Sequence, residues 1–238
     1  DAHVYDTGMV CIIEIMGRHA GWLTASAALA GLAGCAPDLI YLPETDFDME
    51  KFVESVERIY REKGNCIVAV SEGVHYADGK FVSEAKTSAT DGFGYAQRGG
   101  PAGLLAAVTK ERTGAKVRGI ELSLLQRCAA HAASAVDVEE AFMAGKTAVE
   151  AAVAGDTGKM VAFKRAEGSE YKCEYVLVPL TSVANYEKKV PAEWITPDGT
   201  GVTQEFIDYA LPLIQGSVER PTENGLPRYA RLKKVLAK

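Results

Sequence analysis

The chain has 238 residues, of which 47% are hydrophobic and 24% charged, and its formal net charge is −6. This is an ordinary globular composition for one large domain or two small ones, without the basic tract that a nucleic-acid-binding protein carries. No apolar run approaches the roughly 20 residues that a membrane-spanning helix needs, and no signal peptide is recognisable.

The cysteine pattern is the next constraint. The chain has five cysteines, an odd number, scattered through mostly apolar segments: Cys11, Cys35, Cys66, Cys128 and Cys173. Neither Cys-x-x-Cys nor His-x-x-x-His occurs, so a zinc site is not expected. The pattern predicts buried free thiols in a reducing compartment, and we expect a cytoplasmic protein.

The first predicted element is a strand at Val10–Ile15, a nearly continuous and β-branched apolar run. Such a run indicates a strand buried on both faces of a parallel sheet. It is followed by a glycine-bearing turn that carries Arg18, and then by an Ala-rich segment that predicts a helix over 22–30, closed near Gly31.

The turn after this strand is a candidate binding loop. Ligands of open parallel sheets bind beyond the carboxyl ends of the strands, and a helix N-terminus offers free amides to an anion. The planar guanidinium of Arg18 suits phosphate. The alternative is that Arg18 caps the turn or pairs with Glu14.

The chain continues as alternating strands and helices. A short strand at 39–42 precedes a helix that Asp48 caps and Gly64 ends, and a third strand covers 66–70. After a long polar loop at 75–100, Pro101 opens a helix over 102–112 that Gly114 closes, and a fourth strand covers 117–122. This alternation predicts an α/β fold with a parallel sheet.

The rest of the chain reads differently. Asp137 is predicted to cap a long helix that ends near Ala154, with Glu140 completing a capping box. Two β-like segments at 160–164 and 175–179 indicate a hairpin or a meander, and 203–210 a short helix. The remaining tail is expected to be mostly irregular.

Polar side chains follow three of these strands: Met16-Gly17-Arg18, Ser71-Glu72 and Gln126-Arg127. Because the carboxyl ends of parallel strands meet at one edge of a sheet, we expect these groups to converge. Guanidinium groups bind phosphate and a carboxylate accepts hydroxyl protons, so the set suits a sugar phosphate. Each charge taken alone is equally compatible with a structural ion pair.

The sequence EIMGRHAGW, residues 14–22, closely resembles the substrate loop of the phosphofructokinases, especially their pyrophosphate-dependent bacterial branch. Four more segments resemble motifs of that family and stand in the same order: APDLIYLPE (36–44), VSEG (70–73), QRGG (97–100) and LLQRCA (124–129). The resemblance implies a Rossmann-like phosphofructokinase fold, made of a substrate domain and a return segment toward a first domain that this chain does not contain.

The resemblance also implies roles for individual residues. The fructose 6-phosphate ligands would be Met16, Gly17, Arg18, Glu72 and Arg127. Arg118 matches an arginine that the family supplies to the neighbouring subunit's site, which implies a homodimer or homotetramer. His19 and His131 are expected to pack or orient neighbours, without a catalytic role.

Two positions depart from the family pattern. Leu124 stands where the family commonly has His or Tyr, and Met9 stands near the place of a second cross-subunit arginine. Arg98 or Lys86 from the long loop would have to compensate, or the affinity for the sugar phosphate is lower. Relatives with a nucleotide effector site place a carboxylate near Asp38, but the match there is loose, and we expect no allosteric nucleotide control.

The domain organisation implied by the resemblance has three parts. Residues 1–126 form the fructose 6-phosphate-binding α/β domain, 127–180 the return segment, and 181–238 a carboxy-terminal extension. The family's Gly-Gly-Asp donor loop and Thr-x-Asp-x-Asp catalytic loop do not occur in this chain. We therefore expect a piece of a longer protein, with no catalytic or metal-binding residue of its own and with the Mg²⁺ ligands in the amino-terminal half.

The implied function is transfer of a phosphoryl group from pyrophosphate to fructose 6-phosphate in glycolysis, with Mg²⁺. An ATP-dependent 6-phosphofructokinase is one alternative, and a non-catalytic sugar-phosphate-binding or regulatory subunit is another. A dinucleotide-binding module is disfavoured because no Gly-x-Gly-x-x-Gly follows any strand. The chain alone is expected to be inactive, and to expose an apolar stripe on the helix predicted to begin after Asp137.

Overall fold

The computed structural model describes residues 8–84, 100–168, 170–231 and 233–236. The chain divides into two compact units, Asp1–Cys128 with Thr181–Leu211, and Ala129–Leu180 with Pro212–Lys238. The first unit contains a parallel sheet with helices, so the predicted α/β class is confirmed. The division differs from the three expected parts because Thr181–Leu211, expected to belong to the carboxy-terminal extension, is part of the first unit.

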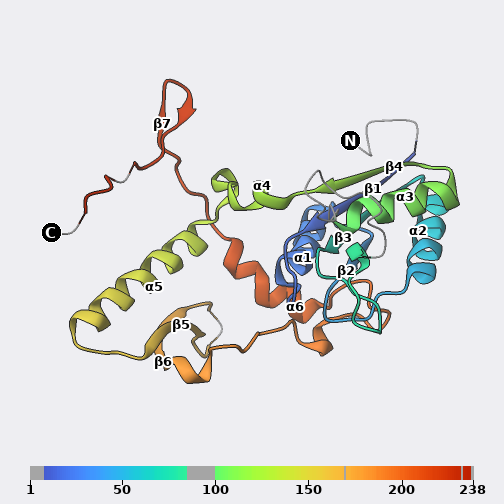
Figure 1. Cartoon of the computed structure of the whole chain (residues 1–238). Coiled ribbons are helices and arrows are strands. Elements are labelled where there is room, and N and C mark those ends of the chain that lie inside the picture. Colours follow the sequence, from blue (N-terminus) through green and yellow to red (C-terminus); the bar gives the residue numbers. More distant parts are fainter. Residues whose placement is uncertain (1–7, 85–99, 169, 232, 237–238) are drawn as a thin grey trace. The chain divides into compact units, whose positions relative to one another are not determined.

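The sheet of the first unit has, within the described residues, four parallel strands in the order β2-β3-β1-β4. These strands are β1 (Met9–Ile15), β2 (Leu39–Tyr41), β3 (Asn65–Ser71) and β4 (Lys116–Glu121). The helices of the unit are α1 (Trp22–Ala25), α2 (Met49–Lys63), α3 (Pro101–Thr113), α4 (Ser123–Arg127) and α6 (Gln204–Ala210) (Figure 1). The strands agree with the predicted ones to within one residue at most ends.

One face of the sheet is covered by α2 and α3. Alternate strand residues such as Val10, Ile12 and Val68 pack in one core with Phe52 of α2 and Leu105 of α3, and all of them are fully buried. The apolar stripe of α2 faces this core, as its helical spacing predicts.

The other face of the sheet is covered by α1 and by residues that lie far away in the sequence. Ile15 and Leu42 pack there with Val190, Ile195 and Phe206, which the chain supplies from its last 50 residues. The central strands are therefore buried on both faces, as their continuous apolar sequence predicts.

The predicted ends of α2 and α3 are confirmed. Asp48 accepts hydrogen bonds from the amides of Glu50 and Lys51 at 3.0 and 3.1 Å, and Gly64 ends α2 in the left-handed conformation at φ 75°. Pro101 begins α3 and Gly114 ends it. These are the residues that local capping chemistry requires.

The helix predicted over 22–30 is wrong in type and length. Only Trp22–Ala25 is α-helical, and Ser26–Ala33 continues as a 3₁₀ helix that Gly34 ends. The Ser26 hydroxyl donates to the carbonyl of Leu23 at 2.6 Å, a local bond that competes with regular helix hydrogen bonding.

The second unit consists of α5 (Ala135–Val153), the antiparallel pair β5 (Lys159–Arg165) and β6 (Cys173–Pro179), and the short pair β7 (Thr222–Glu223) and β8 (Leu226–Pro227). The predicted hairpin is confirmed. The predicted cap of α5 is wrong, because Ser134 accepts the amide of Asp137 at 3.1 Å and the helix begins earlier. Glu140 instead accepts from the Tyr171 hydroxyl at 2.5 Å, so no capping box forms.

The cysteines are free, as predicted, but mostly not buried. Cys66 is buried, Cys11 and Cys173 are half-buried, and Cys35 and Cys128 are exposed. Cys35 lies just beyond the helix end at Gly34, and Cys128 lies just beyond α4. Both are therefore exposed at helix ends, although the residues around them in the sequence are mostly apolar. Among the described residues, no helix combines the length and the hydropathy needed to cross a bilayer.

Candidate functional site

The strand register brings the predicted polar groups to one edge of the sheet. Ile15, the last residue of β1, lies beside Ser71, the last residue of β3, and Glu14 lies beside Glu121 at the end of β4. The turn after β1 and Glu72 after β3 therefore begin at the same carboxyl edge, where parallel sheets bind ligands.

The turn after β1 is fixed by hydrogen bonds from two directions. The amide of Met16 donates to Gln126 Oε1 at 2.8 Å, and the amide of Gly17 donates to Glu72 Oε1 at 3.3 Å. The Ser71 hydroxyl donates to the carbonyl of Gly17. Gly17 has φ +147°, a conformation that side-chain-bearing residues rarely adopt, so glycine is required there.

A second glycine lets the two loops cross. A Cβ atom on Gly73 would lie 1.7 Å from the carbonyl oxygen of Arg18, so only glycine fits where the chain after β3 passes the turn after β1. The backbone of Arg18 and the segment that carries Glu72 are in contact through this crossing.

The Arg18 guanidinium is exposed and available for a ligand. It lies over the ring of Phe81, with its central carbon 5.1 Å from the ring centroid, and within the described part of the chain it forms no ion pair. The alternative of an Arg18–Glu14 pair is not realised, because Glu14 Oε2 accepts the amide of Ala102 at 3.0 Å.

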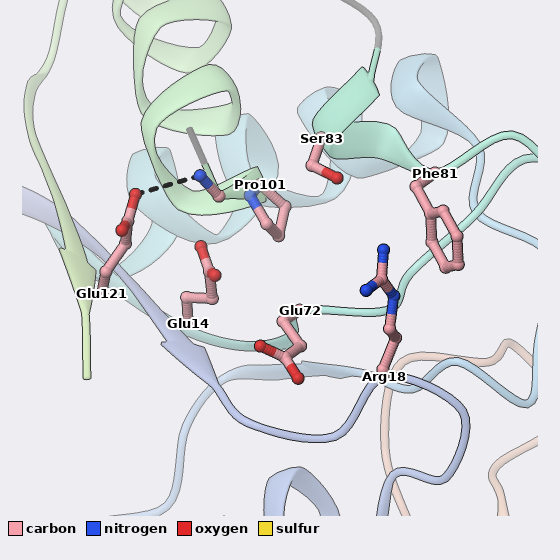
Figure 2. A pocket seen from close by; sticks show the side chains of 8 residues that line it. Glu14, Arg18, Glu72, Phe81, Ser83, Pro101 and Glu121 are labelled. Atoms are coloured by element: carbon pink, nitrogen blue, oxygen red, sulfur yellow. Dashed lines mark hydrogen bonds between the residues drawn. The ribbon is translucent and has the colours of Figure 1, made fainter. Parts of the chain in front are cut away.

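These groups line a cavity of about 250 Å³. Figure 2 shows the Arg18 guanidinium beside Phe81, the Glu72 carboxylate between Arg18 and Glu14 in this view, and Ser83 above them. The remaining lining residues are Gly100, Pro101 and Glu121. One guanidinium and three carboxylates thus surround a space about as large as a small molecule.

Two of the three carboxylates serve the beginning of α3. Glu121 Oε1 accepts the amide of Gly100 at 3.1 Å, and Glu14 accepts that of Ala102, so both lie at the positive end of the helix. Burial raises the pKa of Glu14, and the charges of Glu121 and Glu72 raise it further against the opposing effect of the Ala102 amide. Glu14 is buried, with only 9% of its surface exposed.

Glu72 is the carboxylate that remains available to a ligand. It is half-buried, and one of its oxygens accepts the Gly17 amide. Its second oxygen has the capacity to accept a hydrogen bond from a ligand hydroxyl, while Arg18, across the same cavity, offers a planar donor to a phosphate. The arrangement therefore fits a ligand with a phosphate at one end and hydroxyl groups at the other.

The site does not fit a metal ion on its own. Among the described residues, no group of three His, Cys, Asp or Glu side chains is placed to hold one. Each carboxylate of the cavity already accepts a backbone amide: Glu14 and Glu121 bind amides at the beginning of α3, and Glu72 binds an amide of the turn after β1.

Comparison with known proteins agrees with this geometry. The family model described as "Phosphofructokinase" matches residues 2–152. The chain is 43% identical over 226 residues to the pyrophosphate–fructose 6-phosphate 1-phosphotransferase of Halomonas elongata, covering 94% of this chain and 54% of the relative. It is 44% identical over 230 residues to the protein of the same name from Xanthomonas campestris, covering 95% and 54%.

The chain belongs to the phosphofructokinase family. Its structure is similar to that of a pyrophosphate-dependent phosphofructokinase from Marinobacter aquaeolei, with a TM-score of 0.81 and 39% identity, over 98% of this chain and 55% of that one. The chain thus spans about half the length of the phosphofructokinases that it matches.

The residues that the resemblance assigned to the phosphofructokinase acceptor site are only partly brought together. Arg18 and Glu72 line the cavity, and Gly17 contacts Glu72 through its amide. Arg127 is exposed at the end of α4, next to Gln126, and does not line the cavity. Arg118 is exposed on β4 and lies beside Cys11, four positions before the end of β1.

The departures from the phosphofructokinase pattern have different surroundings. Leu124 is 67% exposed, whereas Met9 is buried in the sheet with 5% exposed. Arg98 and Lys86, named as possible compensating cations, lie outside the described residues. Asp38 binds Lys63 Nζ at 2.5 Å and the amide of Ile67 at 2.8 Å, so its carboxylate is already engaged within the fold.

The sequence assigns no ligand role to four residues that line the cavity, Glu14, Phe81, Ser83 and Glu121. Gln126, expected at this edge of the sheet, holds the turn through the amide of Met16. A single glutamate inside the apolar run of β1 was a usable signal, because a buried carboxylate needs a partner. Phe81 and Ser83 carried no signal in a loop without periodicity.

Proposed function

We propose that this chain is the acceptor-binding part of a pyrophosphate-dependent 6-phosphofructokinase. In the proposed reaction the 1-hydroxyl oxygen of fructose 6-phosphate attacks one phosphorus of pyrophosphate. The bond from that phosphorus to the bridging oxygen breaks, the hydroxyl proton passes to a base, and the products are fructose 1,6-bisphosphate and phosphate.

The observation that carries the proposal is that the Arg18 guanidinium, which forms no ion pair with any described residue, lines the same cavity as the available Glu72 carboxylate at the carboxyl edge of the sheet. Arg18 would bind the 6-phosphate and Glu72 a sugar hydroxyl, while Gly17 and Met16 let the backbone approach. The names of the relatives support fructose 6-phosphate and pyrophosphate as the substrates.

Two further arginines complete the proposed site from other directions. Arg127 would add a phosphate contact at the rim, from the end of α4. Arg118 would serve the site of a neighbouring copy in a homodimer or homotetramer, which is consistent with its exposed place on β4, away from the cavity of its own chain.

The donor site belongs, in this proposal, to the part of the phosphofructokinases that this chain does not span. That part would supply the base, the cradle for pyrophosphate and the Mg²⁺ ligands, and the chain alone would be inactive. The described residues fit no metal ion, so we assign none of them to Mg²⁺. We place the enzyme in cytoplasmic glycolysis.

The test is a kinetic comparison in the intact gene product, with pyrophosphate and ATP as separate donors. Arg18→Ala should raise the KM for fructose 6-phosphate roughly 10- to 100-fold, because a hydrogen bond to a charged group contributes about 1.5–3 kcal/mol. The KM for pyrophosphate should change less than twofold. Arg58→Ala, which removes an exposed guanidinium on α2 with a surface partner in Glu62, is the matched control.

Three other outcomes would contradict parts of the proposal. Equal losses for both substrates would contradict the assignment of Arg18 to the acceptor. Turnover with ATP and none with pyrophosphate would support the ATP-dependent alternative. Binding of fructose 6-phosphate without turnover of either donor would support a regulatory or sugar-phosphate-binding subunit.

A further inference from the structure

A segment from the far end of the chain is fastened to the Arg18 turn. We call residues 181–195 the strap; they belong to the first unit, although about 160 residues separate them from the turn. Glu187 Oε1 of the strap lies 2.6 Å from His19 Nδ1, and the carbonyl of Lys188 accepts from Trp22 Nε1 at 2.7 Å. The strap thus contacts the residues directly after Arg18.

Glu44, which follows β2, joins the strap and the turn through one atom. Its Oε1 accepts the amide of Gly21 and the amide of Val190, both at 2.9 Å. A Cβ on Gly21 would lie 2.7 Å from the other oxygen, Oε2, and 2.9 Å from Cδ of Pro43, so a larger residue would displace the carboxylate. Oε2 is buried and has no hydrogen-bond partner among the residues that the structure describes, which leaves the carboxylate dependent on the two amides that Oε1 holds.

The strap is itself anchored firmly. Val190 and Ile195 are buried with 3% and 7% exposed, in the core on the second face of the sheet. Trp194 packs edge to face against Trp22, with ring centroids 6.2 Å apart, and Phe206 contacts both. The strap cannot leave without uncovering this cluster, so it forms a fixed support.

The second half of the turn, residues 18–21, is supported by the close crossing at Gly73 and by the strap. Gly17 is held by Glu72 and Ser71, but the Arg18 side chain has no ion pair with any described residue. The polar contacts on the following residues come from Glu187, Lys188 and, for Gly21, Glu44. The direction of the Arg18 backbone is therefore set from one side by the sheet and from the other by the strap.

We propose that the strap is part of the acceptor site, with Glu187 and His19 as a positioning pair that holds Arg18 ready for the phosphate of the substrate. This inference rests on the proposed function, because it assigns the strap to the same ligand. Misplacing a binding group by about 1 Å is enough to weaken a site that depends on geometry. The side chains of His19 and Glu187 are 55% and 50% exposed, so loss of the pair should alter the position of the turn without unfolding the domain.

The experiment is a double-mutant cycle in the intact gene product. Glu187→Ala and His19→Ala should each raise the KM for fructose 6-phosphate two- to fivefold, with kcat and the KM for pyrophosphate within twofold of the parent. Because the two side chains act through each other, the double variant should be no worse than either single variant. Glu62→Ala, which removes an exposed glutamate of α2 whose surface partner is Arg58, is the matched control outside the strap and should leave all three constants unchanged.

Several results would overturn the inference. A change in stability alone, without a selective rise in the KM for fructose 6-phosphate, would reduce the strap to a structural clasp. Additive effects of the two single variants would show that Glu187 and His19 act separately. If Arg18→Ala retains its selective effect while the Glu187 variant behaves like the control, the strap inference fails and the proposed function stands. If Arg18→Ala itself shows no selectivity, the proposed function fails first.

Discussion

Gly73 provides the sharpest test of the site geometry. A methyl group added there would lie 1.7 Å from the carbonyl oxygen, 2.4 Å from the carbonyl carbon and 2.7 Å from the Cα of Arg18. These atoms are backbone, so no side-chain rotation relieves the contact. Gly73→Ala therefore separates the loop after β3 from the turn after β1.

The size of the effect follows from the distances. Reaching even 3.0 Å, the shortest distance that real Cβ contacts show, requires the two backbones to separate by more than 1 Å. The Gly17–Glu72 hydrogen bond, already 3.3 Å long, would break. Overpacking of this kind typically destabilises by about 1–3 kcal/mol, and a displacement near 1 Å can lower activity about 100-fold.

Stability and binding should be measured separately. Trp22 and Trp194, the two tryptophans of the chain, both belong to the first unit, so tryptophan fluorescence reports on its unfolding. A loss of about 1–3 kcal/mol lowers Tm by roughly 2–12 °C in a chain of this size. Activity of the intact gene product should show a KM for fructose 6-phosphate raised more than that for the donor.

Gly103→Ala is the matched control. Gly103 lies inside α3, and a Cβ there meets no atom within 4 Å. Alanine in a helix interior should stabilise by roughly 0.5–1 kcal/mol relative to glycine, so this variant should melt higher. If Gly73→Ala kept the parent's stability and its affinity for fructose 6-phosphate, the close crossing of the two loops would be refuted.

Three further predictions concern charge, assembly and association. The raised pKa of Glu14 means that folding favours its protonated form, so its contribution to stability is complete below the ordinary pKa near 4.3 and is lost as the pH rises through the pKa of the folded state. Glu14→Gln should therefore reduce the dependence of the free energy of unfolding on pH between pH 4 and 7. An unchanged dependence would contradict burial as the cause. Arg18→Ala and Arg118→Ala subunits of the intact gene product should each be weakened in fructose 6-phosphate affinity. Mixing them should restore some activity at low fructose 6-phosphate concentration if the site is shared between copies, and verified hybrids without rescue would place both arginines in one site. The 238-residue chain alone should not turn over fructose 6-phosphate, and it should self-associate through α5, where Phe142 is 65% exposed. Phe142→Ser should then reduce the sedimentation coefficient. A strictly monomeric parent chain would refute the predicted self-association.

The amino-acid sequence alone determined the elements whose chemistry is local. Asp48, Gly64 and Gly114 begin or end helices where capping rules place them, because a cap satisfies amides or carbonyls within a few residues. The buried strands were predictable because a strand that is covered on both faces is a nearly continuous apolar run, without alternating polar residues. The family motif identified Arg18 and Glu72, which the structure brings to one cavity.

The sequence pattern did not decide where a helix begins when two residues could cap it, nor which type of helix forms. Both Ser134 and Asp137 can cap a helix, and the structure uses Ser134, which lets α5 begin at Ala135 with more backbone hydrogen bonds. The Ala-rich segment after Trp22 has high α-helix propensity, yet it continues as a 3₁₀ helix. Propensity is a weak prior that packing overrides.

Only the tertiary structure decided what the last part of the chain does. The sequence of the strap carries short and polar runs that predict an irregular extension, yet Val190 and Ile195 are buried against the sheet and Glu187 contacts His19. Likewise, nothing near Glu14 in the sequence predicts that it accepts the amide of Ala102, 88 residues away. Periodicity and capping report on neighbours in the chain, whereas these contacts exist only because folding brings distant backbone amides and carboxylates together.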